Sequence, residues 1–146
     1  MTLAPGLVWS HVALNCRDQA TTVDFYRRYL GFEQVRSVDL GGHQIVFLRS
    51  GAVLLELFDA DGDALFDPKQ DGPANPGVIR HLAFQTDDVD AFLERVGDDV
   101  PVSLGPMSFD AFIPGWRTVW LLDPDGVIVE VSQGYRDQDD DDRRNG

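Results

Sequence analysis

The feature that most constrains this chain is an internal repeat of about seventy residues. Four positions of the first copy recur in the second with closely similar spacing: His11 and His81, Ala13 and Ala83, Asp18 and Asp88, and Glu56 and Glu130. Two copies of one pattern favour the same supersecondary unit, so the repeat predicts two similar modules, which pair either within one chain or across a dimer.

The apolar pattern predicts the same order of elements in both copies. The first copy predicts a strand at 7–15, a helix at 19–30 and strands near 33–39, 43–49 and 52–59. The second copy predicts a strand at 78–86, a helix from 89 to 96 and strands near 101–108, 116–122 and 126–133. Asp18 and Asp88 are typical N-caps, and Gly31 and Gly97 are typical stops. The fold class is therefore α+β, built from two βαβββ modules.

The chain has 146 residues, which suits a single domain, 1–146. We expect module one at 7–59 and module two at 78–134. Residues 60–77 are rich in Asp, Gly and Pro and predict a linker. Residues 135–146 contain five aspartates between Asp137 and Asp142 and predict a disordered acidic tail.

The overall charge limits the partners. Lys and Arg number 12 against 25 Asp and Glu, a net charge of −13, which argues against nucleic acid. No apolar run is long enough to span a bilayer, and the N-terminus lacks the pattern of a signal peptide. The single cysteine, Cys16, excludes an internal disulfide. We therefore expect a cytoplasmic protein with a small-molecule substrate and no membrane partner.

Glu56 and Glu130 each lie within an apolar strand, where an ionised carboxylate is costly unless it is paired or binds a cation. Strand alternation puts Leu54, Glu56 and Phe58 on one face. The opposite faces, Val53-Leu55-Leu57 and Val127-Val129-Val131, are fully apolar and would pack on the helices. Both glutamates therefore face away from the helices.

His11 and His81 lie inside the first strand of their modules in this interpretation. Each module then supplies one His and one Glu, and packing about a pseudo-twofold axis would bring four ligands to one point. Two imidazoles and two carboxylates suit one divalent cation, and an octahedral shell leaves two open positions. Taken singly, each residue is more often a hydrogen-bonded core His or an edge Glu, but their recurrence in the repeat favours the metal site.

Four further residues are candidates for substrate binding. A two-residue turn at Ser50-Gly51 would place Ile45 opposite Glu56 and put Phe47 and Arg49 on the same face. Ordinary packing or exposure is the alternative for both. Trp9 shares the face of His11. Trp120 lies on the seventh strand, whose register the sequence leaves open.

Three segments resemble the vicinal oxygen chelate superfamily, which includes glyoxalase I, extradiol dioxygenases and bleomycin-resistance proteins. They are His11-Val-Ala-Leu, the helix Val23-Asp-Phe-Tyr-Arg-Arg-Tyr-Leu-Gly-Phe-Glu33, and Asp123-Pro-Asp-Gly-Val-Ile-Val-Glu130. The resemblance covers about residues 7–134. It implies a cupped mixed sheet with the helices outside and the metal inside. The order His11, Glu56, His81, Glu130 resembles the ligand set of glyoxalase I.

This resemblance implies a metal-dependent lyase or isomerase that uses metal-assisted proton transfer on a small oxygenated substrate. Glu130 is the first candidate for the base and Glu56 the second. The metal could be nickel, zinc, cobalt, manganese or iron, and a homodimer is expected. Two alternatives stay open: an extradiol-type dioxygenase with iron, and a metal-free drug- or metabolite-binding resistance protein. Asn15 stands where glyoxalase I usually has a glutathione-binding Arg, which weighs against glutathione.

Overall fold

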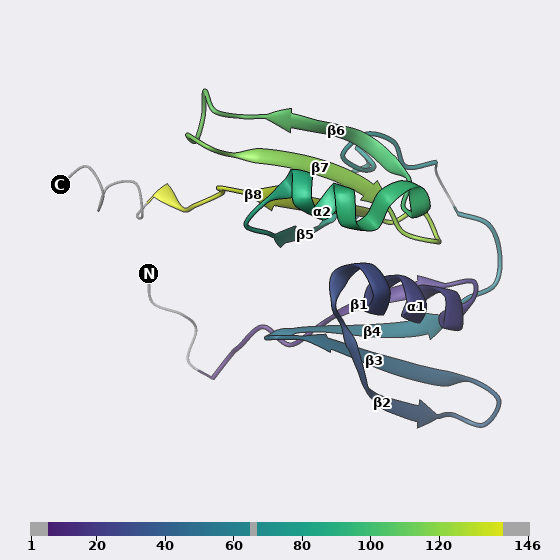
Figure 1. Ribbon diagram of the computed structural model, residues 1–146. Coiled ribbons are helices and arrows are strands. Elements are labelled where there is room, and N and C mark those ends of the chain that lie inside the picture. The colour runs from purple at the N-terminus through teal and green to yellow at the C-terminus, as the bar shows by residue number, and fades with distance from the viewer. Residues whose placement is uncertain (1–5, 65–66, 139–146) are drawn as a thin grey trace. The chain divides into compact units, whose positions relative to one another are not determined.

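The structure is a computed structural model that describes residues 6–64 and 67–138. In the first half, β1 (Val12–Cys16) is followed by α1 (Gln19–Leu30), β2 (Glu33–Asp39), β3 (Gln44–Ser50) and β4 (Val53–Asp59). In the second half, β5 (Leu82–Gln85) is followed by α2 (Val89–Val96), the short 3₁₀ helix η1 (Gly97–Asp99), β6 (Val102–Ser108), β7 (Arg117–Leu122) and β8 (Ile128–Gln133). Figure 1 shows the two sets of elements.

Both halves have one sheet topology. The strand order is β1-β4-β3-β2 in the first sheet and β5-β8-β7-β6 in the second. In the first sheet β1 and β4 pair in parallel, and in the second sheet β5 and β8 do. All other neighbouring strands pair antiparallel. The predicted α+β class with two βαβββ modules is confirmed, as two four-stranded mixed sheets.

The helix ends follow from local capping. The Asp18 carboxylate accepts from the amide of Thr21, and the Asp88 carboxylate accepts from the amide of Ala91. These bonds satisfy amides that the first turn of a helix leaves without a partner. Gly31 ends α1 with a φ of 73°, a left-handed conformation that glycine adopts at little cost.

Each helix covers one face of its own sheet (Figure 1). In the first half α1 contacts β4, whose Leu55 and Leu57 are buried. In the second half α2 contacts β8, whose Val129 and Val131 are buried. The predicted division of β4 and β8 into an apolar face and a glutamate face is confirmed, so Glu56 and Glu130 lie on the sheet faces opposite the helices.

Two strands are shorter than the sequence predicts. Pairing with β4 begins at Val12 and pairing with β8 begins at Leu82, so the ladders do not extend back over residues 7–11 and 78–81. The expectation that His11 and His81 lie inside strands is therefore wrong. Each histidine is the residue immediately before its strand.

The predicted β3–β4 turn is also wrong by one residue. Ser50 pairs with Val53, so the turn consists of Gly51 and Ala52, and Gly51 has a φ of 55° that favours glycine. The pairing consequently places Phe47, rather than Ile45, opposite Glu56. The observed register differs from the predicted one by two positions, an even number, so Phe47 still shares the face of Glu56.

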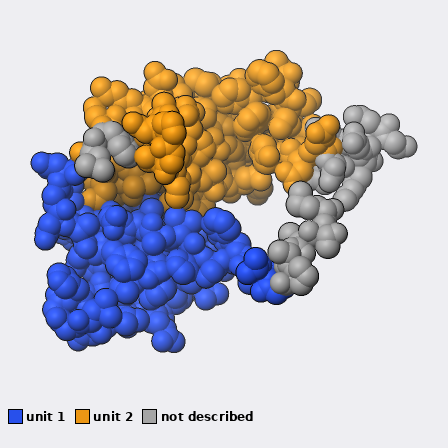
Figure 2. Space-filling view, turned by 180° about the vertical axis from the view of Figure 1, so that it is seen from behind, with its two compact units in different colours: residues 1–63 blue, residues 64–146 orange. Residues whose placement is uncertain are grey.

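The chain divides into two compact units, residues 1–63 and 64–146 (Figure 2). Each unit contains one module. The expected acidic tail falls largely on residues 139–146, which lie outside the described residues. Over the described ranges, no helix has the length and apolar character needed to cross a membrane.

Candidate metal centre

Module one brings its two predicted ligands into direct contact. His11 Nε2 lies 2.6 Å from Glu56 Oε2, and the glutamate side chain is only 14% exposed. The register places Ala13 and Phe47 on either side of Glu56, so the carboxylate stands in the middle of the sheet. An ionised carboxylate only accepts hydrogen bonds, so Nε2 carries the proton of this contact.

Module two repeats this pair at the equivalent place. His81 Nε2 lies 3.6 Å from Glu130 Oε1, and the glutamate side chain is 15% exposed. Ala83 and Trp120 flank Glu130 in the sheet, as Ala13 and Phe47 flank Glu56. Each module therefore pairs one His with one Glu at an equivalent place in its sheet.

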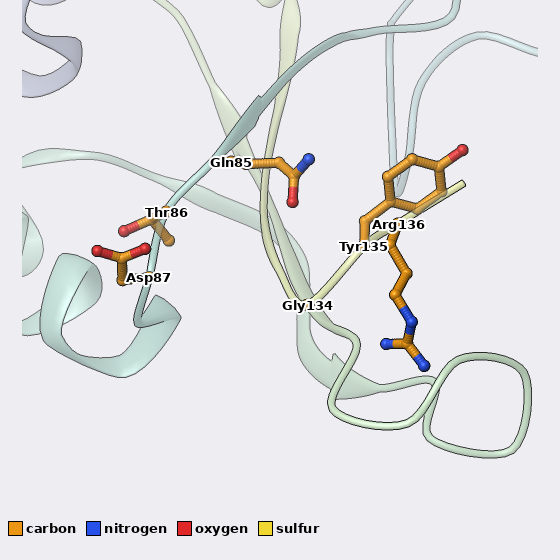
Figure 3. Close-up of a pocket in the computed structure, with 6 residues that line it drawn as sticks. All are labelled: Gln85, Thr86, Asp87, Gly134, Tyr135 and Arg136. Atoms are coloured by element: carbon orange, nitrogen blue, oxygen red, sulfur yellow. The ribbon is translucent and has the colours of Figure 1, made fainter. Parts of the chain in front are cut away.

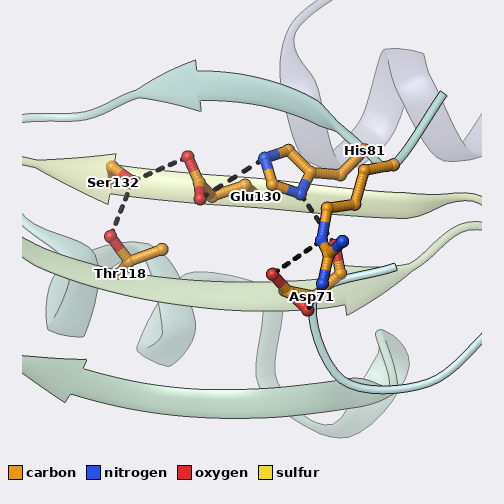
Figure 4. A network of polar contacts seen from close by, with 6 residues as sticks. Asp71, His81, Thr118, Glu130 and Ser132 are labelled. Carbon is orange, nitrogen blue, oxygen red and sulfur yellow. Dashed lines mark hydrogen bonds and ion pairs between the residues drawn. The ribbon is translucent and has the colours of Figure 1, made fainter. Parts of the chain in front are cut away.

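The orientation of His81 is set from the other side of its ring (Figure 4). His81 Nδ1 lies 2.7 Å from the main-chain carbonyl oxygen of Asp71. A carbonyl only accepts, so Nδ1 is the donor, and in the neutral ring Nε2 keeps its lone pair. The Glu130 carboxylate, which also only accepts, lies 3.6 Å from Nε2. Two facing acceptors favour a cation between them, and a donor bond behind the ring is the usual support of a metal-binding histidine.

Asp71 is itself held in place. Arg80 donates two hydrogen bonds to its carboxylate, from Nε over 3.0 Å and from Nη2 over 3.2 Å. The hydrogen bond from Arg80 is the main cause of the lowered pKa of Asp71. These two hydrogen bonds hold Asp71 near the start of β5, the strand that follows His81. Sequence reasoning missed Asp71 because it lies in the segment interpreted as a linker.

Glu130 has a second support, on its other carboxylate oxygen. Ser132 donates to Glu130 Oε2 over 3.2 Å, and the hydroxyls of Ser132 and Thr118 lie 2.7 Å apart (Figure 4). Both residues are almost completely buried. A serine two positions after a glutamate, in an otherwise apolar strand, was the available signal, whereas the position of Thr118 depended on the register of β7.

The four candidate substrate residues differ in placement. Phe47 lies directly opposite Glu56 and Trp120 directly opposite Glu130, both partly or fully covered. Arg49 is exposed on the face of Phe47. Trp9 is 80% exposed and precedes β1, so strand alternation no longer links it to His11. Their role in binding a substrate stays a prediction.

The bulge in β2 adds one residue that the sequence did not suggest. The register of β2 and β3 shifts between Gln34 and Arg36, which brings Arg36 opposite Phe47. Arg36 and Arg49 therefore share the sheet face of Glu56. A one-residue bulge reverses the alternation of a strand, so the sequence pattern alone could not assign this face.

A pocket of about 530 Å³ opens at the carboxyl ends of β5 and β8 (Figure 3). Its lining residues are Gln85, Thr86, Asp87, Gly134, Tyr135 and Arg136. None of the predicted ligands or substrate residues lines it, so it is distinct from the His–Glu pair of module two.

The donor set fits a divalent cation. Over its described residues, neither unit gathers three or more His, Cys, Asp or Glu side chains at one point, and each supplies one His–Glu pair. Two ligands from one unit are too few for the four or more protein and solvent ligands that such ions take.

Comparison with known proteins agrees with this architecture. The chain matches the Glyoxalase/Bleomycin resistance protein/Dioxygenase superfamily over residues 9–131. That match covers most of the chain, so the protein belongs to this superfamily, as the resemblance in its sequence predicted.

Individual relatives are distant. The uncharacterized protein YwkD of Bacillus subtilis is 26% identical over 126 residues, which cover 83% of this chain and 92% of YwkD. The crystal structure of SMU.1112c aligns with a TM-score of 0.67 and 26% identity, over 87% of this chain and 98% of that one. A variant of the fosfomycin resistance protein FosX of Listeria monocytogenes, complexed with Mn(II) and 1S,2S-dihydroxypropylphosphonic acid, aligns with a TM-score of 0.65 and 23% identity, over 91% and 93% of the two chains.

Proposed function

We propose that this protein is a divalent-metal-dependent enzyme of the lyase or isomerase type, acting by proton transfer on a small oxygenated substrate. Its metal would be held by His11, Glu56, His81 and Glu130. The observation that carries this proposal is the recurrence of a His–Glu pair at equivalent sheet positions in both modules, with His81 Nδ1 donating to the Asp71 carbonyl on the other side of its ring.

A divalent cation bound by these residues supplies Lewis acidity toward a substrate carbonyl or hydroxyl oxygen. Side chains of the protein would transfer the proton and exclude water. The side chains of Glu56 and Glu130 are only 14% and 15% exposed, and a carboxylate so shielded from solvent can take a proton from a carbon next to the carbonyl and return it to a neighbouring atom. Phe47 and Trp120, next to these carboxylates, would exclude water from the reacting atoms.

Two measurements test the proposal. Elemental analysis of purified protein should find a divalent transition metal, and a protein without one that also fails to bind Mn(II) would point to the metal-free binding class instead. Solvent deuterium incorporation into a panel of small α-hydroxy carbonyl compounds, followed by NMR, should reveal proton transfer. Glu56→Gln and Glu130→Gln should each abolish it, whereas Glu94→Gln on the exposed side of α2 should not. Undiminished exchange in either site variant would remove that glutamate from the mechanism.

A phosphonate-modifying activity is the second candidate. It is favoured by the fold shared with FosX and by Arg36 and Arg49, which lie on the sheet face of Glu56. Guanidinium groups bind phosphonate oxygens in a fork geometry. Incubation with fosfomycin and Mn(II), followed by phosphorus NMR, separates the two candidates, because only the second predicts loss of the fosfomycin signal.

A further inference from the structure

The hydroxyl chain beside Glu130 has a defined direction. The ionised Glu130 carboxylate only accepts, so the single hydroxyl proton of Ser132 is committed to it. The Ser132 oxygen must then accept the proton of the Thr118 hydroxyl, 2.7 Å away. Thr118 and Ser132 lie opposite each other on β7 and β8, so the sheet register itself aligns the chain.

Module one breaks this arrangement at the corresponding positions. Phe58 follows Glu56 by two residues, as Ser132 follows Glu130, and Ile45 lies opposite Phe58 as Thr118 lies opposite Ser132. Neither apolar side chain can donate a hydrogen bond. Within the described residues, the Glu56 carboxylate contacts His11 Nε2, whereas Glu130 also accepts a hydroxyl hydrogen bond on its second oxygen.

The hydroxyl chain does not lead a proton to solvent. Thr118 is completely buried and Ser132 is 3% exposed. A proton relay would need a path from Thr118 to solvent, and Thr118 is completely buried. The geometry suits orientation of one carboxylate oxygen, which leaves the other oxygen directed at His81.

We propose that Ser132 and Thr118 are positioning residues that make Glu130 the fixed ligand of the metal. This assignment rests on the proposed metal-dependent function. The buried hydroxyl chain carries it, because Glu130 receives a hydroxyl hydrogen bond that the apolar Phe58 and Ile45 could not give to Glu56.

The test uses the full chain and Mn(II) alone, with affinity measured by equilibrium dialysis and electron paramagnetic resonance. Ser132→Ala should weaken Mn(II) binding by about tenfold or more, the usual effect of removing a group that orients a ligand. Ser132→Thr keeps the hydroxyl and should restore affinity. Thr118→Val should act in the same direction as Ser132→Ala, and Thr118→Ser should not. Ser37→Ala, at an exposed serine of β2, is the matched control.

The two glutamates separate the proposal further. Glu130→Gln should lower Mn(II) affinity more than Glu56→Gln does. Equal affinity of Ser132→Ala and the unaltered protein would overturn the positioning role, and equal losses in the two Gln variants would show that Glu130 is not the more firmly held ligand. Both results leave the metal-dependent function standing. Failure of the unaltered protein to bind any divalent cation would instead remove the proposed function and this inference together. Thermal unfolding of each variant shows whether a loss of affinity comes from unfolding.

Discussion

His81 donates from Nδ1 to the main-chain carbonyl of Asp71, across ten residues of sequence and a distance of 2.7 Å. This single bond decides which ring nitrogen is available to a ligand. Asp71, which lies in the predicted linker, is therefore part of the candidate centre.

The first prediction concerns the tautomer of His81. In metal-free protein at neutral pH, nitrogen-15 NMR should show the Nδ1–H form for His81, because the Asp71 carbonyl needs a donor. His11 should show the Nε2–H form, since its Nε2 faces the Glu56 carboxylate at 2.6 Å while its Nδ1 faces the Ser10 hydroxyl at 2.8 Å. The same tautomer for both histidines would contradict this difference between the modules.

The second prediction concerns Gly72, which has a φ of +126°. A Cβ at this position would lie 1.9 Å from the main-chain oxygen of Arg80, so the linker could not lie as close to Arg80 as it does. Gly72→Ala should therefore destabilise the protein and move Asp71 away from His81. Gly77→Ala is the matched control, because Gly77 has a φ of +81° with open space around it.

Gly77→Ala should cost only backbone strain, roughly 1–2 kcal/mol. Gly72→Ala should cost clearly more in urea unfolding and should shift the His81 ring signals. Similar unfolding free energies for the two variants would mean that the close approach at Arg80 is not maintained in solution.

The third prediction concerns acid sensitivity in the loop between β6 and β7. Asp110 accepts from the amide of Gly115 over 2.7 Å and from the Ser108 hydroxyl over 2.9 Å. These bonds, the first above all, lower the pKa of Asp110 below its ordinary value of 3.8. The stability they add is complete above the ordinary value and is lost as the pH falls through the lowered one.

The Gly115 amide proton reports this directly. Its NMR shift should titrate with a midpoint below 3.8, and Ser108→Ala should raise that midpoint. Asp110→Asn should abolish the transition. A midpoint at or above the ordinary value in the unaltered protein would show that the loop does not hold the carboxylate.

Much of the fold was predictable because its signals are local. Asp18 and Asp88 begin the helices and Gly31 ends the first one by bonds to their own neighbours, so the sequence alone located them. The glutamate faces of β4 and β8 were also predictable, since alternation depends only on position within a strand.

The site was less predictable where it depends on contacts between distant segments. The β3–β4 register differs from the predicted one because Gly51 and Ala52 form the turn. The bulge in β2 places Arg36 on the face of Glu56. The contact between His81 and the main-chain carbonyl of Asp71 could not be predicted, because every residue type has this carbonyl. Thr118 meets Ser132 only through the pairing of β7 and β8.

The most direct test of the central claim is the stoichiometry of Mn(II) binding, measured by equilibrium dialysis on the unaltered protein and on the variants His11→Ala and His81→Ala. The two His–Glu pairs, if they form one centre, predict one Mn(II) per chain, and each single substitution should lose that binding. Two independent weak sites per chain, or a variant that still binds Mn(II) with unchanged affinity, would contradict the shared centre.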